Sequence, residues 1–184
     1  MFTRDKVTLR PVDWPDREQM YLWHCDSDLE IASGWGPRRS PTTYDAKFQS
    51  FLQDPPDDMV VFAIEAESEL VGRIELAQID REHRNASVGF FIGAREMWGQ
   101  GIGTQAVIIL VDYAFNVENL ERVYAHTYSF NQRSRQLLRS VGFVEEGVLR
   151  KHEFHNGAAR DMVVHGLLAE EFRERHETLF RIPQ

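Results

Sequence analysis

A glycine-rich turn between an apolar strand and an apolar helix is the feature that most limits what this chain can fold into. Glycines stand at every second position, at Gly99, Gly101 and Gly103, after an apolar stretch at 89–92, and residues 104–115 then repeat apolar side chains at helical spacing. A helix that begins in such a turn has unpaired N–H groups and a partial positive charge at its first turn. It can hold a phosphate without a basic side chain, so the turn predicts a site for a phosphate-bearing ligand.

The spacing of the glycines excludes two familiar phosphate motifs. The G-x-G-x-G pattern lacks the later third glycine of a dinucleotide fingerprint, and no Gly-Lys-Ser/Thr follows as in a P-loop. Taken alone, the turn is equally compatible with a flexible connection that binds nothing.

The rest of the chain alternates between strand and helix signals. Seven strands are predicted, at 7–12, 59–66, 70–79, 86–92, 122–128, 143–154 and 158–168. Helices are predicted from about residue 14, where Asp13 is the expected cap, and from Ser40, at 104–115, at 131–141 and at 169–177, while residues 26–40 are expected to be irregular. The order is typical of a mixed α/β (α+β) sheet. With no linker or repeat in sight, residues 1–184 are expected to form one domain.

Composition narrows the class of partner. The chain has 21 Lys and Arg against 29 Asp and Glu, a net charge of -8, which disfavours nucleic acid and suits a cationic or amine substrate. The single cysteine, Cys25, has no partner for an internal disulfide and is expected to be a small core residue. Neither a signal core nor a membrane-length apolar run is visible, so a cytoplasmic protein without a membrane partner is expected, as a monomer or homodimer.

Eight short motifs carry a family resemblance, which extends from residue 7 to residue 168. They are GRIEL at 72–76, RNASVG at 84–89, GQGIGT at 99–104, DYAF at 112–115, Asn131 with Ser134, GF at 142–143, EGVLR at 146–150, and NG with RD at 156–161. In this order they resemble the GNAT acetyltransferase superfamily, and within it the RimJ/RimL-like group of ribosomal-protein N-terminal acetyltransferases.

The resemblance implies a mixed, mostly antiparallel seven-stranded sheet that splays near the strand ending at Ile92, with acetyl-coenzyme A in the splay. Backbone amides of the turn would meet the pyrophosphate, and the pantetheine arm would pair with strand 90–92 as an added strand. Asn131 would face the same arm, although it is also an ordinary helix N-cap. The expected coenzyme-binding residues are Phe91, Ile92, Trp98, Gly99, Gln100, Gly101, Ile102, Gly103, Thr104, Asn131 and Ser134.

The implied chemistry is attack of a neutral amine on a thioester, which needs a base and a proton for the leaving thiolate. Leu138 occupies the position of the tyrosine acid used by many members, so the resemblance assigns the role of acid to Ser134. The alternative is that Ser134 is only a first-turn helix residue whose hydroxyl makes a local hydrogen bond. Ser87 likewise replaces a common glutamate base. Relatives place the base just before the last hairpin, where Glu153 stands. Glu75 or a water is the alternative base. If Glu153 has no catalytic role, it is expected to be an ordinary exposed surface residue.

The free-energy cost of deprotonating the amine narrows the choice of acceptor. A terminal α-amine has a pKa of about 7.7–8.0, whereas a lysine amine near 10.4 costs roughly 3–4 kcal/mol more to deprotonate. A protein or peptide N-terminus is therefore expected, with Glu75, Glu153 and Trp35 of the irregular segment as substrate contacts. A small amine such as a polyamine, an aminoglycoside or another antibiotic is the alternative, as is a coenzyme-binding module that has lost turnover.

Two further sequence details bear on ligands. His152 and His155 lack a cysteine or third ligand beside them, so no metal is expected. Trp98 replaces the arginine or glutamine that is usual before the glycine turn. Because phosphate binding there is by backbone, this change affects only a side-chain contact.

Overall fold

The computed structural model describes residues 1–33 and 39–180. Its strands are β1 (Phe2–Arg4), β2 (Val7–Pro11), β3 (Val60–Ala66), β4 (Glu69–Asp80), β5 (Asn85–Ile92), β6 (Arg122–Tyr128), β7 (Val144–His155) and β8 (Ala158–Leu168). Its helices are α1 (Asp16–His24), α2 (Ser27–Ser33), α3 (Pro41–Gln53), the 3-10 turn η1 (Arg95–Met97), α4 (Ile102–Asn116), α5 (Gln132–Val141) and α6 (Ala169–Arg175). None of these helices is long and apolar enough to span a membrane.

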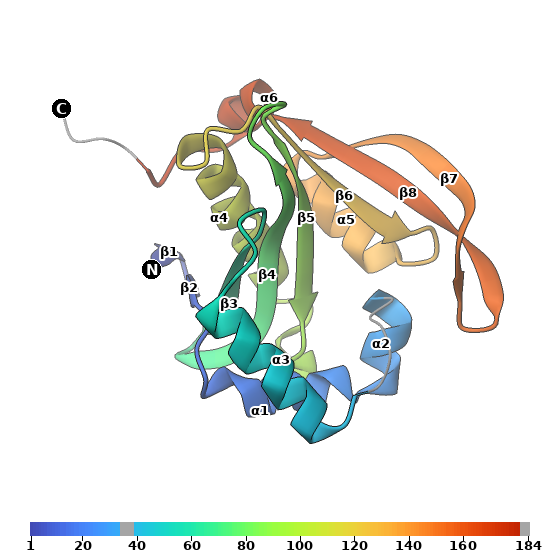
Figure 1. Ribbon diagram of the computed structural model, residues 1–184. Coiled ribbons are helices and arrows are strands. Elements are labelled where there is room, and N and C mark those ends of the chain that lie inside the picture. The colour runs from blue at the N-terminus through green and yellow to red at the C-terminus, as the bar shows by residue number, and fades with distance from the viewer. Residues whose placement is uncertain (34–38, 181–184) are drawn as a thin grey trace.

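The strands form one sheet in the order β1-β2-β3-β4-β5-β6-β8-β7 (Figure 1). Every neighbouring pair is antiparallel except β5 and β6, which run parallel and pair over only three positions, from Asn85 with Arg122 to Ser87 with Tyr124. Beyond Ser87 the two strands separate, and Figure 1 shows them diverging. The predicted mixed, mostly antiparallel and splayed sheet is thereby confirmed.

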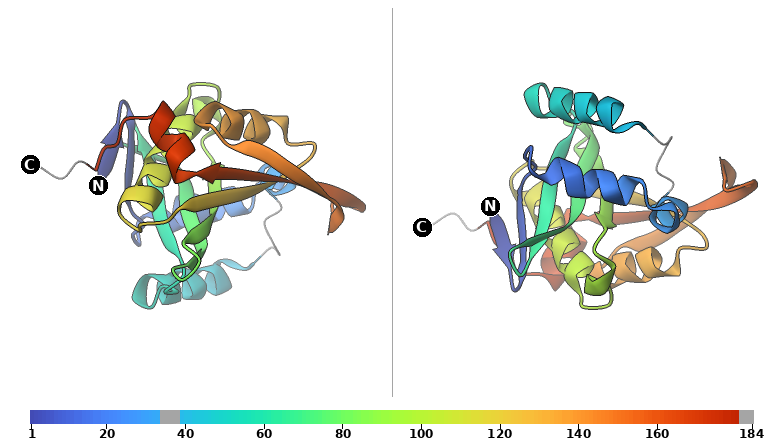
Figure 2. Two further views of the ribbon diagram at one scale, coloured as in Figure 1. Left: turned by 90° about the horizontal axis from the view of Figure 1, so that it is seen from above. Right: turned by 90° about the horizontal axis from the view of Figure 1, so that it is seen from below.

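Helix α4 is the centre of the hydrophobic core. Ten of its residues are buried, including Ile109 and Leu110, which are fully inaccessible. A helix that is apolar nearly all round must lie inside the protein, and α4 packs against one face of the sheet, where Ile74 of β4 and Val88 of β5 are also buried. Helices α1 and α3 lie over the opposite face (Figure 2). This packing fixes the start of α4, and with it the glycine turn, against the end of β5.

Three elements were not predicted: β1, α2 and the short 3-10 turn η1, which falls in the connector before the glycine turn. The sheet has eight strands instead of seven, because Phe2–Arg4 folds back on β2 through a turn in which Asp5 has a φ of 52°. Three residues are too short to show a strand period. The segment predicted to be irregular also contains α2, whose start is held by the Asp26 carboxylate, an acceptor for the backbone N–H of Asp28 and Leu29.

The first helix also begins later than predicted. Pro15 is the N-cap of α1, and the Asp13 carboxylate accepts a hydrogen bond from the N–H of Trp14. The prediction for Cys25 was wrong. The helix buries Met20 and Trp23, whereas Cys25 lies just past its last residue and is exposed.

Candidate functional site

A cavity of about 430 Å³ opens where β5 and β6 separate. Its walls are the end of β5, the glycine turn, the first turn of α4 and one side of α5. Ten of the eleven residues predicted to bind the coenzyme line this cavity. They are Phe91, Ile92, Trp98, Gly99, Gly101, Ile102, Gly103, Thr104, Asn131 and Ser134. The sequence motifs therefore converge on one hollow in the fold.

The glycine turn has a backbone that other residues rarely adopt. Gly99 and Gly101 have φ values of 78° and 80°, in the left-handed region that favours glycine. A Cβ added at either position would meet no atom within 4 Å, so the backbone is open on that side. Gly101 is the N-cap of α4 and makes no side-chain cap. The first N–H groups of α4 therefore remain available to an acceptor that approaches from the cavity.

Gly103 serves a different purpose. A Cβ there would lie 2.8 Å from Cδ1 of Leu137 on α5, which is closer than real contacts allow. The missing side chain lets α5 approach the start of α4, and both helices then line the cavity.

Side chains around the turn hold it in place. The indole Nε1 of Trp98 donates a hydrogen bond of 2.9 Å to the carbonyl oxygen of Ile92, which ties the turn to the end of β5. Gln100 donates through Nε2 to the carbonyl oxygen of Glu96 at 2.8 Å and does not line the cavity. Of the predicted coenzyme residues, Gln100 is thus the one that does not line the cavity.

Asn131 and Ser134 face each other at the start of α5. The Asn131 carboxamide oxygen accepts a hydrogen bond of 3.1 Å from the backbone N–H of Ser134, so Asn131 is the N-cap of the helix. Both residues also line the cavity. Leu138, one turn further on, is fully buried in the core and supplies no acid.

Glu153 lies outside this cavity and pairs with a buried tyrosine. The Tyr128 hydroxyl, on β6, donates a hydrogen bond of 2.6 Å to Oε2 of Glu153 on β7. Tyr128 is 4% exposed, and its ring stacks on Phe130 and His155 at centroid distances of 5.1 and 5.0 Å. Burial, together with the hydrogen bond and the charge of Glu153, raises the pKa of Tyr128 well above its usual value. The phenol therefore stays protonated and remains a donor to the carboxylate.

Glu75 also lies outside the cavity, on the sheet face opposite α4. It forms an ion pair with Arg73, and its side chain lies over Gly89, where an added Cβ would be 3.0 Å from Oε1. Gly89 thus provides the space that Glu75 occupies. Trp35, the other predicted substrate contact, lies outside the described residues.

Sequence reasoning missed one charged residue of the cavity. Arg133, on α5, lines it and places its guanidinium carbon 4.1 Å from the centroid of the Trp98 indole ring. The two residues are far apart in the chain, so only the folded structure could reveal the contact. Leu29 of α2 and Met97 of η1 add apolar wall that was also not predicted.

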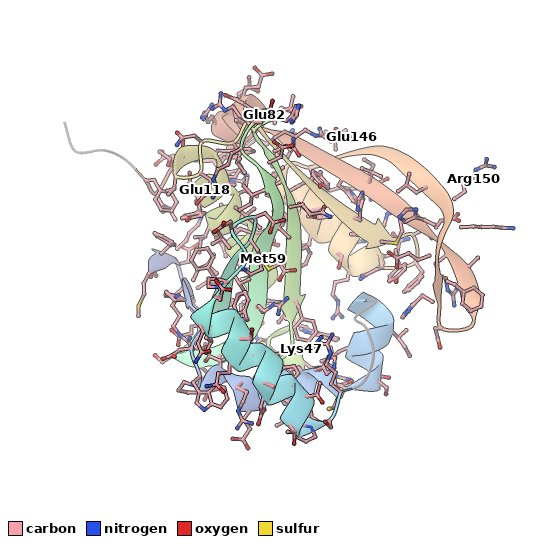
Figure 3. The ribbon with its side chains drawn as sticks, viewed as in Figure 1. Lys47, Met59, Glu82, Glu118, Glu146 and Arg150 are labelled. Carbon is pink, nitrogen blue, oxygen red and sulfur yellow. The ribbon has the colours of Figure 1, made fainter. Side chains whose placement is uncertain are left out.

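A second cavity of about 190 Å³ lies between α3 and strands β3 and β4. Helix α3 has no buried residue, so it stands over the sheet without filling the space beneath it. The described lining combines aromatic and apolar side chains with three cations and contains no carboxylate. These residues are Val12, Met20, Arg39, Tyr44, Lys47, Phe48, Phe51, Met59, Val61 and Arg73 (Lys47 and Met59 are labelled in Figure 3).

In the described part of the chain, no three His, Cys, Asp or Glu side chains gather closely enough to hold a metal ion. The groups that can carry chemistry are the polar side chains of the two cavities described above and the Tyr128–Glu153 pair.

Known proteins share both the sequence pattern and the fold. Residues 6–144 match the family described as Acetyltransferase (GNAT) domain. The Bacillus subtilis protein named Putative ribosomal N-acetyltransferase YdaF is 37% identical, over 94% of this chain and 98% of its own length. The Vibrio cholerae spermidine N-acetyltransferase in complex with CoA and spermine has a TM-score of 0.84 at 25% identity, covering 91% and 98% of the two chains. Mycobacterium smegmatis RimJ in complex with CoA-disulfide has a TM-score of 0.79 at 28% identity, covering 90% and 83%.

Proposed function

The chain belongs to the GNAT acetyltransferase family, and we propose that it moves an acetyl group from acetyl-coenzyme A to the N-terminal α-amine of a protein or peptide. The motif resemblance described above is confirmed by the family match and by the likeness to RimJ. The observation that carries the proposal is the cavity at the splay, which is walled by the glycine turn on one side and Ser134 on the other.

The cavity suits the coenzyme in size and chemistry. Its volume of about 430 Å³ is in the range of small-molecule sites, and the Vibrio and Mycobacterium proteins were both solved with a form of CoA. The first turn of α4 would hold the pyrophosphate, because its N–H groups and dipole favour an anion. The edge of β5 near Phe91 has lost β6 as a partner, so its backbone can pair with the amides of the pantetheine arm.

The proposed reaction is a direct transfer. The amine nitrogen bonds to the acetyl carbonyl carbon, the carbon–sulfur bond breaks, and the sulfur leaves as thiolate. Glu153 takes the proton that the amine loses, directly or through a water, and later releases it to solvent. The Ser134 hydroxyl passes its proton to the sulfur and takes one back from solvent, so the products are the amide and the free thiol. Tyr128 supports this role, since its donated hydrogen bond orients the Glu153 carboxylate and leaves the other oxygen for the acceptor. Glu75 is the weaker candidate for the base because its carboxylate is already paired with Arg73.

The acceptor is the point on which the relatives divide. The YdaF and RimJ matches favour a protein N-terminus, while the Vibrio enzyme is a spermidine acetyltransferase solved with spermine. The second cavity supports the peptide. Arg39 and Lys47 line it, together with Arg73, whose charge is paired with Glu75, and the two lining cations repel a polyamine whereas they attract a peptide that carries a carboxylate.

We propose that the second cavity contacts the acceptor. Arg73 both lines it and pairs with Glu75, which lies over Gly89 of β5. The second cavity is lined by residues of α1 and α3, and these helices lie on the opposite side of the sheet from α4 (Figure 2). Helices α4 and α5 wall the coenzyme cavity. An acceptor that enters from the α3 side would therefore pass these cations before it met the thioester.

Thiol release from acetyl-coenzyme A tests the proposal. The acceptors are a peptide with a free N-terminus and blocked lysines, the same peptide with its N-terminus acetylated, and spermidine. Release with the free peptide alone is expected. Release with spermidine alone would establish the polyamine reading. Coenzyme binding without acceptor-dependent release over a broad panel of amines would indicate a binding module.

A further inference from the structure

The coenzyme cavity has one charged residue in its described lining, and that residue is Arg133. It stands in the first turn of α5, on the wall that faces the glycine turn. Within residues 1–33 and 39–180 it forms no ion pair with a carboxylate. The neighbouring Arg135 and Arg139, by contrast, both pair with Glu145. Arg133 is thus the cation of this helix that has a charge to offer to a ligand.

The Trp98 indole holds the Arg133 guanidinium. The distance of 4.1 Å from the guanidinium carbon to the ring centroid is that of a stacked cation–π pair. The indole is itself fixed by its 2.9 Å hydrogen bond to the Ile92 carbonyl oxygen. A guanidinium held flat on a fixed ring loses less side-chain entropy when it binds a ligand, and its N–H donors stay free at the edge of the plane.

A second arginine near the same ring is already neutralised. The Arg95 guanidinium lies 5.9 Å from the Trp98 centroid and pairs with Asp26 and Asp28. These two carboxylates, at the start of α2, neutralise the charge of Arg95. Two arginines therefore contact one indole, and only Arg133 lines the cavity.

We propose that Arg133, stacked on Trp98, binds a phosphate of the coenzyme. The proposal rests on the proposed function, because it needs a phosphate-bearing ligand in this cavity. Trp98 directly precedes the glycine turn, so a guanidinium on its ring is beside the amides expected to hold the pyrophosphate. Arginine binds phosphate oxygens through two parallel N–H donors and adds a full positive charge, which backbone amides do not carry. The chemistry is shared by the pyrophosphate and the 3′-phosphate of coenzyme A.

Calorimetry on the full chain tests the proposal with coenzyme A and 3′-dephospho-coenzyme A. Arg133→Met is expected to weaken coenzyme A binding by about 10- to 100-fold, the range for a hydrogen-bonded charge. Arg139→Met is the matched control on the same helix and should bind as the wild type does. An equal loss for both ligands assigns the contact to the pyrophosphate, whereas a loss for coenzyme A alone assigns it to the 3′-phosphate.

The stack itself is tested by a double-mutant cycle with Trp98→Leu. If the indole acts by holding Arg133, the two substitutions together should cost less than the product of their separate effects. Arg133→Met with wild-type affinity would overturn the proposal while leaving the proposed function intact. A wild-type protein that binds no coenzyme A would overturn both. Thermal unfolding of each variant shows that the fold is kept, as expected for the exposed Arg133.

Discussion

The hydroxyl of Tyr128 donates a 2.6 Å hydrogen bond to Glu153, across the intervening strand β8. Glu153→Gln is expected to lower kcat by about 100-fold or more, since the neutral amide cannot take the amine's proton. Coenzyme affinity should change little, because Glu153 lies outside the coenzyme cavity. Steady-state kinetics and calorimetry check the two parts. Wild-type turnover in this variant would remove Glu153 from the mechanism.

The same pair predicts an orienting effect. Tyr128→Phe keeps the ring stack but removes the donated hydrogen bond that orients the Glu153 carboxylate. The value of kcat/KM is expected to fall severalfold, because the carboxylate is then no longer held in position for the acceptor. Tyr124→Phe, on the same face of β6, is the control. Unchanged kcat/KM in Tyr128→Phe would show that the two side chains touch without a functional link.

Gly101 allows the charge at the turn to be tested separately from its backbone. Asp and Asn both tolerate the left-handed conformation and differ mainly in charge, and either side chain would enter open space. Gly101→Asp is expected to bind coenzyme A at least about tenfold more weakly than Gly101→Asn, because its carboxylate repels the pyrophosphate. Equal affinities in calorimetry would show that no phosphate sits at this turn.

Two serines of α5 line the cavity and form a matched pair. Ser134→Ala is expected to lower kcat by roughly 10- to 100-fold, because the leaving thiolate loses its proton donor. Ser140→Ala should have no effect, since the Ser140 hydroxyl already donates to the Leu137 carbonyl oxygen at 2.7 Å. Measurements with acetyl-coenzyme A at saturation isolate the chemical step. A Ser134→Ala enzyme as fast as the wild type would mean that the thiolate leaves unaided.

Lys47 lines the cavity under α3. Lys47→Glu is expected to raise KM severalfold for a peptide with an acidic second residue and to lower it for a basic one, with little change in kcat. Lys6→Glu, at a solvated lysine that is 82% exposed, is the control. If the two variants showed the same acceptor preference, the second cavity would not contact the acceptor.

His165 predicts how stability varies with pH. It is fully buried, with Nε2 2.9 Å from the Thr127 hydroxyl, and burial lowers its pKa below the ordinary 6.5. A depressed histidine pKa stabilises the fold above pH 6.5 and loses that contribution as pH falls, because the unfolded chain binds the proton more readily. The urea concentration at the midpoint of unfolding should decrease as the pH is lowered from about 7.5 to about 5, and this decrease should be smaller in His165→Gln. His126, whose pKa is also lowered by burial, accounts for part of the remaining slope.

Features written in contiguous residues were predictable. The glycine turn, the Asn131 cap and most strands follow from local rules of backbone conformation, capping and strand period, which a single sequence displays. The splay of the sheet and most residues of the cavity beside it were implied by the family resemblance of the motifs.

Features that join distant residues were not predictable. The stack of Arg133 on Trp98 and the hydrogen bond of Tyr128 to Glu153 are created by packing between elements far apart in the chain. The error at Cys25 had a local cause: the residue was taken to lie within the amphipathic helix, which ends at His24. The roles of Ser134 and Glu153 stay predictions that the variants above test, and the role of Glu75 stays a prediction.

The brevity of the parallel pairing between β5 and β6 has a geometric consequence. Paired strands are about 4.8 Å apart, too close for any molecule to lie between them, and the pairing ends after Ser87. The gap is therefore a wedge, narrow at its apex and widening along β5 toward Ile92. How far a linear ligand can enter from the wide end therefore depends on its width. The backbone itself, before any side chain, restricts how bulky the leading end of the ligand can be.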